Sequence, residues 1–264
     1  MSKIINISCI ADNSKIAQAA YSEISANYNI VDVTKKRGSS SSDTTDVIVV
    51  LGGDGFMLQT MHQYMARNIP FYGMNCGTVG FLMNSYSPHN LIERIEKARA
   101  HILHPLRMYA RTIQGKSHEL LAINEVSIFR QSRQAAKIRI TIDHVVRISE
   151  MIADGILIAT PAGSTAYNSS ANGPIIPLGA NVLALTPLAP FRPRHWRGAL
   201  LNHNSSVSFE ALDPIKRPMN AVADFTEVRD VVNVAIQEDQ KTSIKLLFDP
   251  EHNLEERIIK EQFM

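Results

Sequence analysis

The chain has 264 residues, of which 45% are apolar and 20% charged, and its formal net charge is +2. These totals exclude intrinsically disordered and collagen-like proteins, and the balanced charge argues against a nucleic-acid surface, which needs a wider basic patch. The length fits one large domain or two modest ones, and we expect two.

Two cysteines, Cys9 and Cys76, are too few for a disulfide framework and fit a reducing compartment. The first ten residues are too polar for a signal peptide, and no apolar run approaches the roughly 20 residues that cross a bilayer. The sequence therefore predicts a cytoplasmic protein that partners neither membrane nor nucleic acid.

The first half alternates strand-like and helix-like segments, which predicts a parallel sheet covered by helices in a Rossmann-like three-layer α/β domain. Residues 35–46 are polar and rich in serine, with one glycine, which predicts a surface loop. Ser87 is expected to cap a helix that has Pro88 at its first position. The other predicted strands are 3–10, 28–33, 47–51 and 70–75, and the other predicted helices are 14–26 and 56–67.

From about residue 105, strand signals follow one another at short intervals, as in "KIRITI", where Ile138, Ile140 and Ile142 share one face. Similar runs are "INEVSIF", "DGILIAT", "SVSFEAL" and "VVNVAI". They predict a second, β-rich and β-sandwich-like domain. The expected divisions are an α/β domain at 1–104, a β-rich domain at 105–245, and a tail helix at 246–264 that packs back on the body.

The stretch "DVIVVLGGDGFML" ends a buried strand in Gly52-Gly53-Asp54-Gly55 and opens into a helix. Open α/β folds bind ligands at the carboxyl edge of the sheet. Glycines tolerate positive φ and let backbone N–H groups approach a phosphate, and the helix start adds partial positive charge. The pattern matches neither the dinucleotide fingerprint nor a P-loop, so it predicts another type of nucleotide-phosphate site.

An acid in a phosphate-binding turn repels the phosphate unless it takes a proton or holds a metal ion. Asp54 is therefore either a catalytic group or a simple N-cap of the next helix. The residues of the turn alone leave both interpretations open.

Two further segments carry polar side chains next to apolar strands. In the first, Asn124-Glu125 interrupts an apolar strand, where a ribose diol would offer hydrogen-bond donors to Glu125, unless the pair simply ends a strand in water. In the second, the strand from Asp154 ends in "TPAGSTAYNSS", whose hydroxyls and Tyr167 suit a base, ribose or phosphate. The alternative for this second segment is a cap followed by a tightly packed small-residue helix.

The segment "FRPRHWRGAL" gathers Arg192, Arg194, His195 and Arg197 around Trp196. It could hold nucleotide phosphates or acids at a subunit contact. The simpler expectation is a solvated loop with the tryptophan packed down.

The chain resembles bacterial NAD kinases in three motifs that occur in the family's order: "GGDG", "NE", and "DG" followed by "TPAGSTAY". "GMNCGTVGFL" (73–82) and "NGPII" (172–176) also look like the family's segments. The resemblance covers about 47–224. It implies phosphoryl transfer from ATP or polyphosphate to the 2′-hydroxyl of the adenosine ribose of NAD, forming NADP, with a divalent cation such as Mg²⁺ or Mn²⁺.

The resemblance also implies residue roles. Asp54 would be the general base, and Gly52, Gly53 and Gly55 would hold phosphate. The NAD-binding residues would be Asn124, Glu125, Asp154, Thr165, Ala166, Tyr167 and Ser170. The family's site lies in the cleft between an α/β domain and a β-sandwich-like domain, and its members are usually homodimers or homotetramers.

Three positions depart from the family pattern. Phe56 replaces a small hydroxyl residue, Thr78 replaces a common histidine, and Phe225 follows Asp224 where glycine is usual. Two other hypotheses stay open at this point: a lipid kinase of the diacylglycerol type, and a non-catalytic sensor of NAD or NADP.

Overall fold

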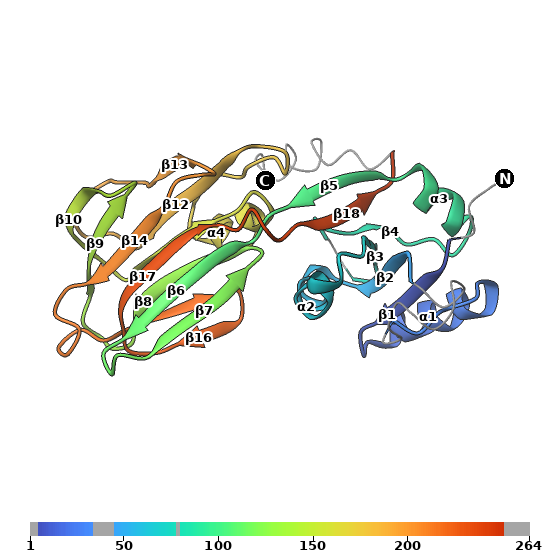
Figure 1. Cartoon of the computed structure of the whole chain (residues 1–264), viewed down its shortest axis with the longest axis horizontal. Helices are drawn as coiled ribbons and strands as arrows, with labels where there is room; N and C mark the ends of the chain where they lie inside the picture. Colours follow the sequence, from blue (N-terminus) through green and yellow to red (C-terminus); the bar gives the residue numbers. More distant parts are fainter. Residues whose placement is uncertain (1–4, 34–44, 78–79, 251–264) are drawn as a thin grey trace. The chain divides into compact units, whose positions relative to one another are not determined.

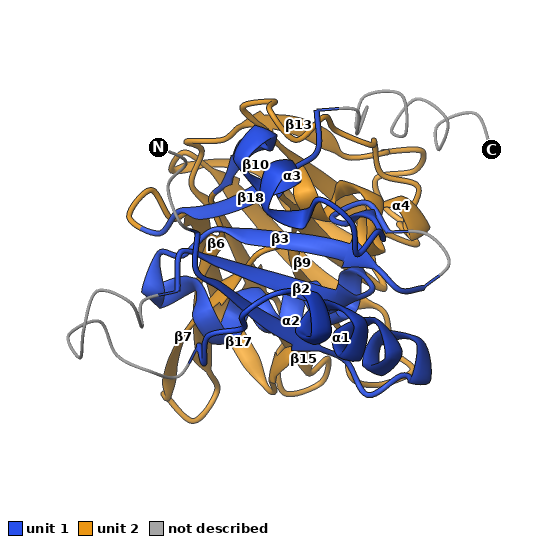
Figure 2. Ribbon diagram, turned by 90° about the vertical axis from the view of Figure 1, so that its right-hand side faces the viewer, with its two compact units in different colours: residues 1–103, 242–264 blue, residues 104–241 orange. Residues whose placement is uncertain are grey.

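The structure is a computed structural model that describes residues 5–33, 45–77 and 80–250. The chain forms two compact units, which Figure 2 colours separately. Unit 1 comprises residues 1–103 and 242–264, and unit 2 comprises residues 104–241. No helix in the described ranges is both long and apolar enough to cross a membrane.

Unit 1 is built on a mixed sheet with the strand order β1-β2-β3-β18-β5 (Figure 1). Parallel pairing joins β1 to β2, β2 to β3, and β3 to both β4 and β18, whereas β5 runs antiparallel to β18. The strand bounds are β1 (Ile7–Ala11), β2 (Val47–Gly52), β3 (Phe71–Asn75), β4 (Asn84–Ser85), β5 (Arg99–Leu103) and β18 (Ile244–Phe248).

Helices cover both faces of this sheet, as the three-layer prediction requires. α1 (Lys15–Asn27) and α3 (Leu91–Lys97) share a core with Val47, Val49 and Leu51 on one face of β2. α2 (Asp54–Tyr64) lies on the other face, where a Cβ on Gly73 would stand 2.5 Å from the end of the Met57 side chain. Because both faces are covered, every residue of β2 is buried.

Two predictions in unit 1 are wrong. Residues 28–33 contribute one isolated bridge, between Ile7 and Ile30, instead of a strand. The third helix has Asn90 as its N-cap instead of Ser87. The Tyr28 hydroxyl explains the later start, since it donates to the Pro88 carbonyl oxygen at 3.0 Å and accepts from the Leu91 N–H at 3.0 Å.

The predicted tail helix is also wrong where it can be compared. Residues 246–248 belong to β18, whose apolar side chains are buried in unit 1. The chain therefore returns from unit 2 to unit 1 at residue 242. Asn84 fixes this strand by donating to the carbonyl oxygens of Gly73 and Leu247, both at 3.0 Å. The rest of that prediction, 251–264, lies outside the described residues, as does almost all of the predicted loop at 35–46.

Unit 2 contains two six-stranded antiparallel sheets, β10-β9-β14-β17-β6-β7 and β13-β12-β11-β8-β15-β16. The bounds are β6 (Leu106–Thr112), β7 (Ser117–Ala122), β8 (Glu125–Arg130), β9 (Ala136–Ile142), β10 (Val145–Ala153), β11 (Gly155–Ala159), β12 (Val182–Leu188), β13 (Ala199–Asn202), β14 (Val207–Ala211), β15 (Met219–Ala223), β16 (Thr226–Val228) and β17 (Val231–Glu238).

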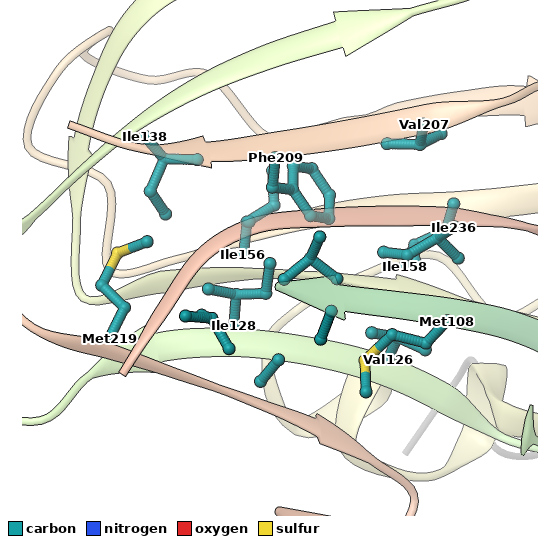
Figure 3. Packing of buried hydrophobic residues seen from close by; sticks show 14 of the residues in the cluster. Met108, Val126, Ile128, Ile138, Ile156, Ile158, Val207, Phe209, Met219 and Ile236 are labelled. Carbon is teal, nitrogen blue, oxygen red and sulfur yellow. The ribbon is translucent and has the colours of Figure 1, made fainter. Parts of the chain in front are cut away.

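Alternating apolar residues of both sheets form one core, as expected for a β-sandwich. Figure 3 shows Ile128 and Ile156 of one sheet gathered with Phe209 and Ile236 of the other. β11 is buried on both faces, because Leu157 and Ala159 pack outward against Ile176 and neighbouring residues. The segment after β11, which includes a short 3-10 helix (Ala162–Thr165) and α4 (Tyr167–Ser170), thus lies against the outer face of the sheet.

Candidate active site

The glycine-rich turn of unit 1 holds a fixed carboxylate. β2 ends at Gly52, Gly53 is the N-cap of α2, and Asp54 is the first helical residue, so the hypothesis that Asp54 is the N-cap is wrong. The backbone N–H of Phe81 donates to Asp54 Oδ2 at 2.7 Å, and that of Leu82 donates to Oδ1 at 3.0 Å. Negative charge is also favoured at the start of a helix.

The loop that holds Asp54 was not predicted from the sequence as part of the site. Gly80 belongs to it, and a Cβ there would stand 2.9 Å from Asp54 Oδ1. The signal was present in "GMNCGTVGFL", whose final residues provide the two N–H groups. Thr78, one of the three departures, lies outside the described residues.

The three glycines of the turn differ in what requires them. A Cβ on Gly52 would stand 2.9 Å from the Phe56 ring and 3.1 Å from Asp12 Oδ2, so packing excludes a larger residue there. Apart from the adjoining residues and the backbone of the same helix, no described heavy atom comes within 4 Å of a Cβ placed on Gly53 or Gly55. In the described part of the chain the positive-φ glycines are Gly115 and Gly198, so positive φ does not explain either residue. Close approach of a ligand to the backbone is the remaining physical reason.

In unit 2, Asn124-Glu125 lies where β7 passes into β8, against the turn after β11. The N–H of Thr160 donates to the Asn124 carbonyl oxygen at 2.9 Å, and the Thr160 hydroxyl donates to the Ile123 carbonyl oxygen at 2.7 Å. A Cβ on Gly163 would stand 2.1 Å from the Asn124 carbonyl oxygen. The "TPAG" turn is therefore pressed against the backbone that carries the two polar side chains.

Two buried oxygen atoms of this pair, Asn124 Oδ1 and Glu125 Oε2, have no hydrogen-bond partner among the described residues. Buried polar atoms in native proteins are generally hydrogen-bonded, so each needs a partner from outside the described residues. The hydroxyls of a ribose diol can supply such partners, because a hydroxyl both donates and accepts. Of the two interpretations of Asn124-Glu125, this one explains the burial, whereas a pair exposed to water does not.

The pKa of Glu125 is raised to about 8, mainly by burial and then by the nearby Asp224, against the opposing effect of the Tyr167 N–H, which donates to the carboxylate. Because the folded pKa exceeds the unfolded value, the folded state binds the extra proton, and stability falls as pH rises from about 5 to 8. Glu125→Gln should remove this dependence. We expect denaturant unfolding to show the variant gaining at least about 1 kcal/mol on the unsubstituted protein between pH 5 and pH 9.

A matched control for this prediction is Glu150→Gln, at a side chain that is 43% exposed. It should leave the pH dependence of the unsubstituted protein in place. If Glu125→Gln and Glu150→Gln follow the same curve, Glu125 does not carry the buried proton.

Asp224 was noted in the sequence only because Phe225 follows it, yet it organises the Asn124-Glu125 segment. Its carboxylate accepts the backbone N–H groups of Ile123 at 2.7 Å, Asn124 at 2.9 Å and Glu125 at 3.1 Å. Phe225, the next residue in the β15–β16 turn, is 56% exposed.

The structure places the remaining predicted NAD-binding residues on both sides of α4's start. Thr165 ends the 3-10 helix, and Ala166 is the N-cap of α4. Tyr167, which is 42% exposed, donates its backbone N–H to the Glu125 carboxyl group. Ser170 is the exposed last residue of α4. Asn168, by contrast, is fully buried and donates to the carbonyl oxygens of Ser164 and Pro174, which makes it a packing residue.

Asp154 is not brought together with Asn124 and Glu125. Asp154 immediately precedes Gly155, the first residue of β11, which pairs with Phe129. Glu125 pairs with Ala159 at the other end of β11, roughly 13 Å away at about 3.3 Å per residue. Arg130 Nε donates to Asp154 Oδ1 at 2.5 Å. Asp154 nevertheless lies within electrostatic range of Tyr167, whose pKa is raised by burial, then by Glu125 and by Asp154.

The arginine-rich segment fits the simpler expectation. Trp196 packs against the core of unit 2, and the guanidinium groups of Arg192 and Arg194 lie over the exposed Phe191 ring.

A metal ion would find few protein ligands. The described ranges contain no group of three or more His, Cys, Asp or Glu side chains that could hold one. These residues therefore do not form an all-protein metal site.

A carboxylate fixed beside a glycine-rich helix start in an α/β unit, and a buried polar pair in a β-sandwich unit, define a two-unit nucleotide-binding protein. Models of the ATP-NAD kinase N-terminal and C-terminal domains match residues 6–102 and 123–221. The chain belongs to the NAD kinase family, whose members are enzymes.

Individual relatives agree over nearly the whole chain. An NAD kinase of Xylella fastidiosa is 52% identical over 257 residues, covering 97% of this chain and 95% of the relative. An NAD kinase of Caulobacter vibrioides is 53% identical over 247 residues, covering 94% and 92%. The family thus favours the first of the three functional hypotheses over a lipid kinase or a sensor.

Two solved structures share the fold at 20% sequence identity. Yeast NADH kinase complexed with NADH superposes with a TM-score of 0.81, covering 98% of this chain and 87% of that one. An NAD kinase from Archaeoglobus fulgidus in complex with ATP gives 0.73, covering 97% and 98%.

Proposed function

We propose that this enzyme transfers the γ-phosphoryl group of ATP to the 2′-hydroxyl of the adenosine ribose of NAD, forming NADP and ADP, with Asp54 as the general base. The observation that carries the proposal is the position of the Asp54 carboxylate. It is held by two backbone N–H groups, at the start of a helix, beside two glycines that nothing inside the described chain requires.

The chemistry follows from this position. The N–H groups of Phe81 and Leu82 hold the Asp54 carboxylate in place, and an ionised carboxylate can accept a proton from the substrate hydroxyl. Asp54 takes the hydroxyl proton while that oxygen bonds to the γ-phosphorus and the bond to the ADP oxygen breaks. Phosphoryl transfer depends mainly on positioning and charge stabilisation, so a turn without a Walker lysine can serve it.

The dinucleotide is proposed to bind to unit 2. Asn124 Oδ1 and Glu125 Oε2 meet the ribose hydroxyls, which satisfies both buried atoms. Thr165, Ala166, Tyr167 and Ser170 line the pocket, with the exposed Tyr167 ring able to stack on a base. Asp154 is also proposed to bind NAD. It lies at the other end of β11, but its negative charge acts on Tyr167 and raises the pKa of that residue. The NADH bound to the yeast relative and the ATP bound to the archaeal one support these two ligand classes.

The divalent cation, Mg²⁺ or Mn²⁺, would be held chiefly by the nucleotide phosphates. Mg²⁺ is commonly bound by one or two carboxylates together with substrate phosphates, and that mode fits a chain whose described residues offer no three-residue cluster. When bound, the ion neutralises phosphate charge. Asp54, the acidic residue of the glycine-rich turn, is the protein carboxylate that could contact the ion.

We further propose that the protein acts in the cytoplasm as a homodimer or homotetramer. The free cysteines Cys9 and Cys76 support a reducing compartment. Light scattering coupled to size-exclusion chromatography measures the assembly directly, and a monomer at micromolar concentration would contradict that part of the proposal.

The function is tested by incubating the purified protein with NAD and Mg²⁺ and with either ATP or polyphosphate, and measuring NADP. Product with ATP is the expected result, and product with polyphosphate alone would change the donor. Dinucleotide binding without turnover with either donor would favour a sensor, and preferential phosphorylation of diacylglycerol would favour a lipid kinase.

The role of Gly55 separates catalysis from folding. Gly55→Ala places a methyl group where no described atom lies within 4 Å, in the first turn of a helix, so stability should stay equal or rise by about 0.5 kcal/mol. The methyl group would, however, obstruct the phosphate, and we expect the KM for ATP to rise about tenfold.

The matched control is Gly179→Ala, since Gly179 also has no described atom within 4 Å of the added Cβ and is exposed. This variant should change neither KM nor turnover. Wild-type kinetics for Gly55→Ala would show that phosphate does not approach this glycine.

A further inference from the structure

The Asp224 carboxylate binds three successive peptide groups that lie about 100 positions away in sequence. Oδ2 accepts the N–H of Ile123, and Oδ1 accepts those of Asn124 and Glu125. The Asp224 N–H in turn donates to the Glu125 carbonyl oxygen at 3.1 Å. Asp224 lies in the left-handed region at φ 51°, which aspartate tolerates better than most residues.

The three peptide N–H groups of residues 123–125 all donate to the Asp224 carboxylate, and an ionised carboxylate suits them because it only accepts hydrogen bonds. This negative charge lies beside Glu125, which is buried and whose Oε2 has no partner among the described residues. Tyr167 of α4 also lies beside Glu125: its backbone N–H donates to the Glu125 carboxyl group, and the pKa of its phenol is raised by burial, then by Glu125 and Asp154. Two neighbouring carboxyl groups do not both ionise readily in such a site.

We propose that Asp224 is a positioning residue for dinucleotide binding, whose carboxylate fixes the backbone of residues 123–125 and so places Asn124 and Glu125 against the ribose. Burial and the nearby Asp224 carboxylate both favour the protonated form of Glu125. Glu125 then donates a hydrogen bond to a ribose oxygen while Asn124 Oδ1 accepts one from a ribose hydroxyl. This inference rests on the proposed function, because it assigns a role to the proposed ribose contacts.

The test is the affinity for NAD, measured by calorimetry without ATP, in the wild type and in Asp224→Asn. Asparagine keeps the side-chain shape and tolerates the left-handed backbone, but it removes the charge and one acceptor. We expect the Kd for NAD to rise about tenfold at pH 7.

The pH profile separates positioning from a merely structural role. In the wild type, protonated Glu125 is present below pH 8 and is lost as pH rises through about 8, so the Kd should increase there. Without the Asp224 charge, Glu125 loses its proton more easily, and the increase should begin at lower pH. Simple damage to the fold would weaken binding at every pH without moving this transition.

Asp143→Asn is the matched control. Asp143 also lies in a left-handed turn of unit 2, at φ 50°, and its carboxylate accepts the Ser206 N–H at 2.9 Å and the Ser205 hydroxyl at 3.2 Å. This variant should lose similar stability and keep the wild-type Kd and its pH dependence.

An unchanged Kd and an unchanged transition in Asp224→Asn would overturn the inference. A wild type that binds NAD yet forms no NADP with either donor would instead overturn the proposed function, and the binding measurements would still decide the role of Asp224.

Discussion

Asp54→Asn is expected to lower the turnover number about a thousandfold, because a positioned general base contributes roughly 10²–10⁴ to a rate. The amide has nearly the shape of the carboxylate and can still accept one of the N–H groups from Phe81 and Leu82. Folding should therefore lose only about 1 kcal/mol. The KM values for NAD and ATP should change little, since the lost interaction belongs to the transition state.

A matched control for this variant lies at the opposite end of β2. Asp46 accepts the Asn6 N–H at 3.0 Å, so Asp46→Asn also removes the charge from a carboxylate that holds a backbone N–H. Its turnover number should remain that of the wild type. A folded Asp54→Asn protein with undiminished turnover would show that another group takes the proton.

Gly163→Ala is expected to destabilise the fold more than any other variant proposed above. The added Cβ would stand 2.1 Å from the Asn124 carbonyl oxygen, 2.4 Å from its carbonyl carbon and 2.6 Å from its Cα. These are backbone atoms that cannot rotate away, so the 3-10 helix that holds Gly163 must move away from the β7–β8 connection. We expect a loss of about 3 kcal/mol or more, measured by denaturant unfolding, which corresponds to a fall in Tm of roughly 6–12 °C.

The same displacement moves Asn124, so the surviving folded protein should also have a higher KM for NAD. Gly179→Ala serves again as the control, since it adds the same methyl group in open space. A Gly163→Ala protein that melts with the wild type would mean that the "TPAG" turn does not press on Asn124.

Local patterns predicted the segments that matter most for the site. The apolar run before Gly52 and the helical spacing after Phe56 place Asp54 at a strand-to-helix turn from sequence alone. The alternation of Ile138, Ile140 and Ile142 likewise predicts a sandwich strand, β9.

Long-range contacts could not be predicted in this way. The partners of Asp54 are 27 and 28 positions away, and those of Asp224 are 99 to 101 positions away. Helical and strand periodicities reflect only local neighbours, so they cannot predict contacts between residues this far apart in sequence. The Tyr28 hydroxyl that shifts the start of α3 is a third example, with partners 60 and 63 positions away.

Buried apolar runs were ambiguous for a related reason. Residues 246–248 were assigned to a helix from the polar and apolar residues that follow them, yet they add a strand to a sheet whose other members precede residue 104. For the glycines of the phosphate turn, the sequence predicted the right place but did not decide between two physical reasons. Their presence was informative, although access to the backbone and not positive φ distinguishes Gly53 and Gly55.

The central claim is that the chain phosphorylates the 2′-hydroxyl of NAD's adenosine ribose. The most direct test is phosphorus and proton NMR of the product formed from NAD, ATP and Mg²⁺ by the wild type, with Asp54→Asn as the blank. A single new phosphomonoester on the 2′-oxygen, absent from the blank, is the predicted result. A phosphate on any other hydroxyl, or no new phosphomonoester from the wild type, would contradict the claim.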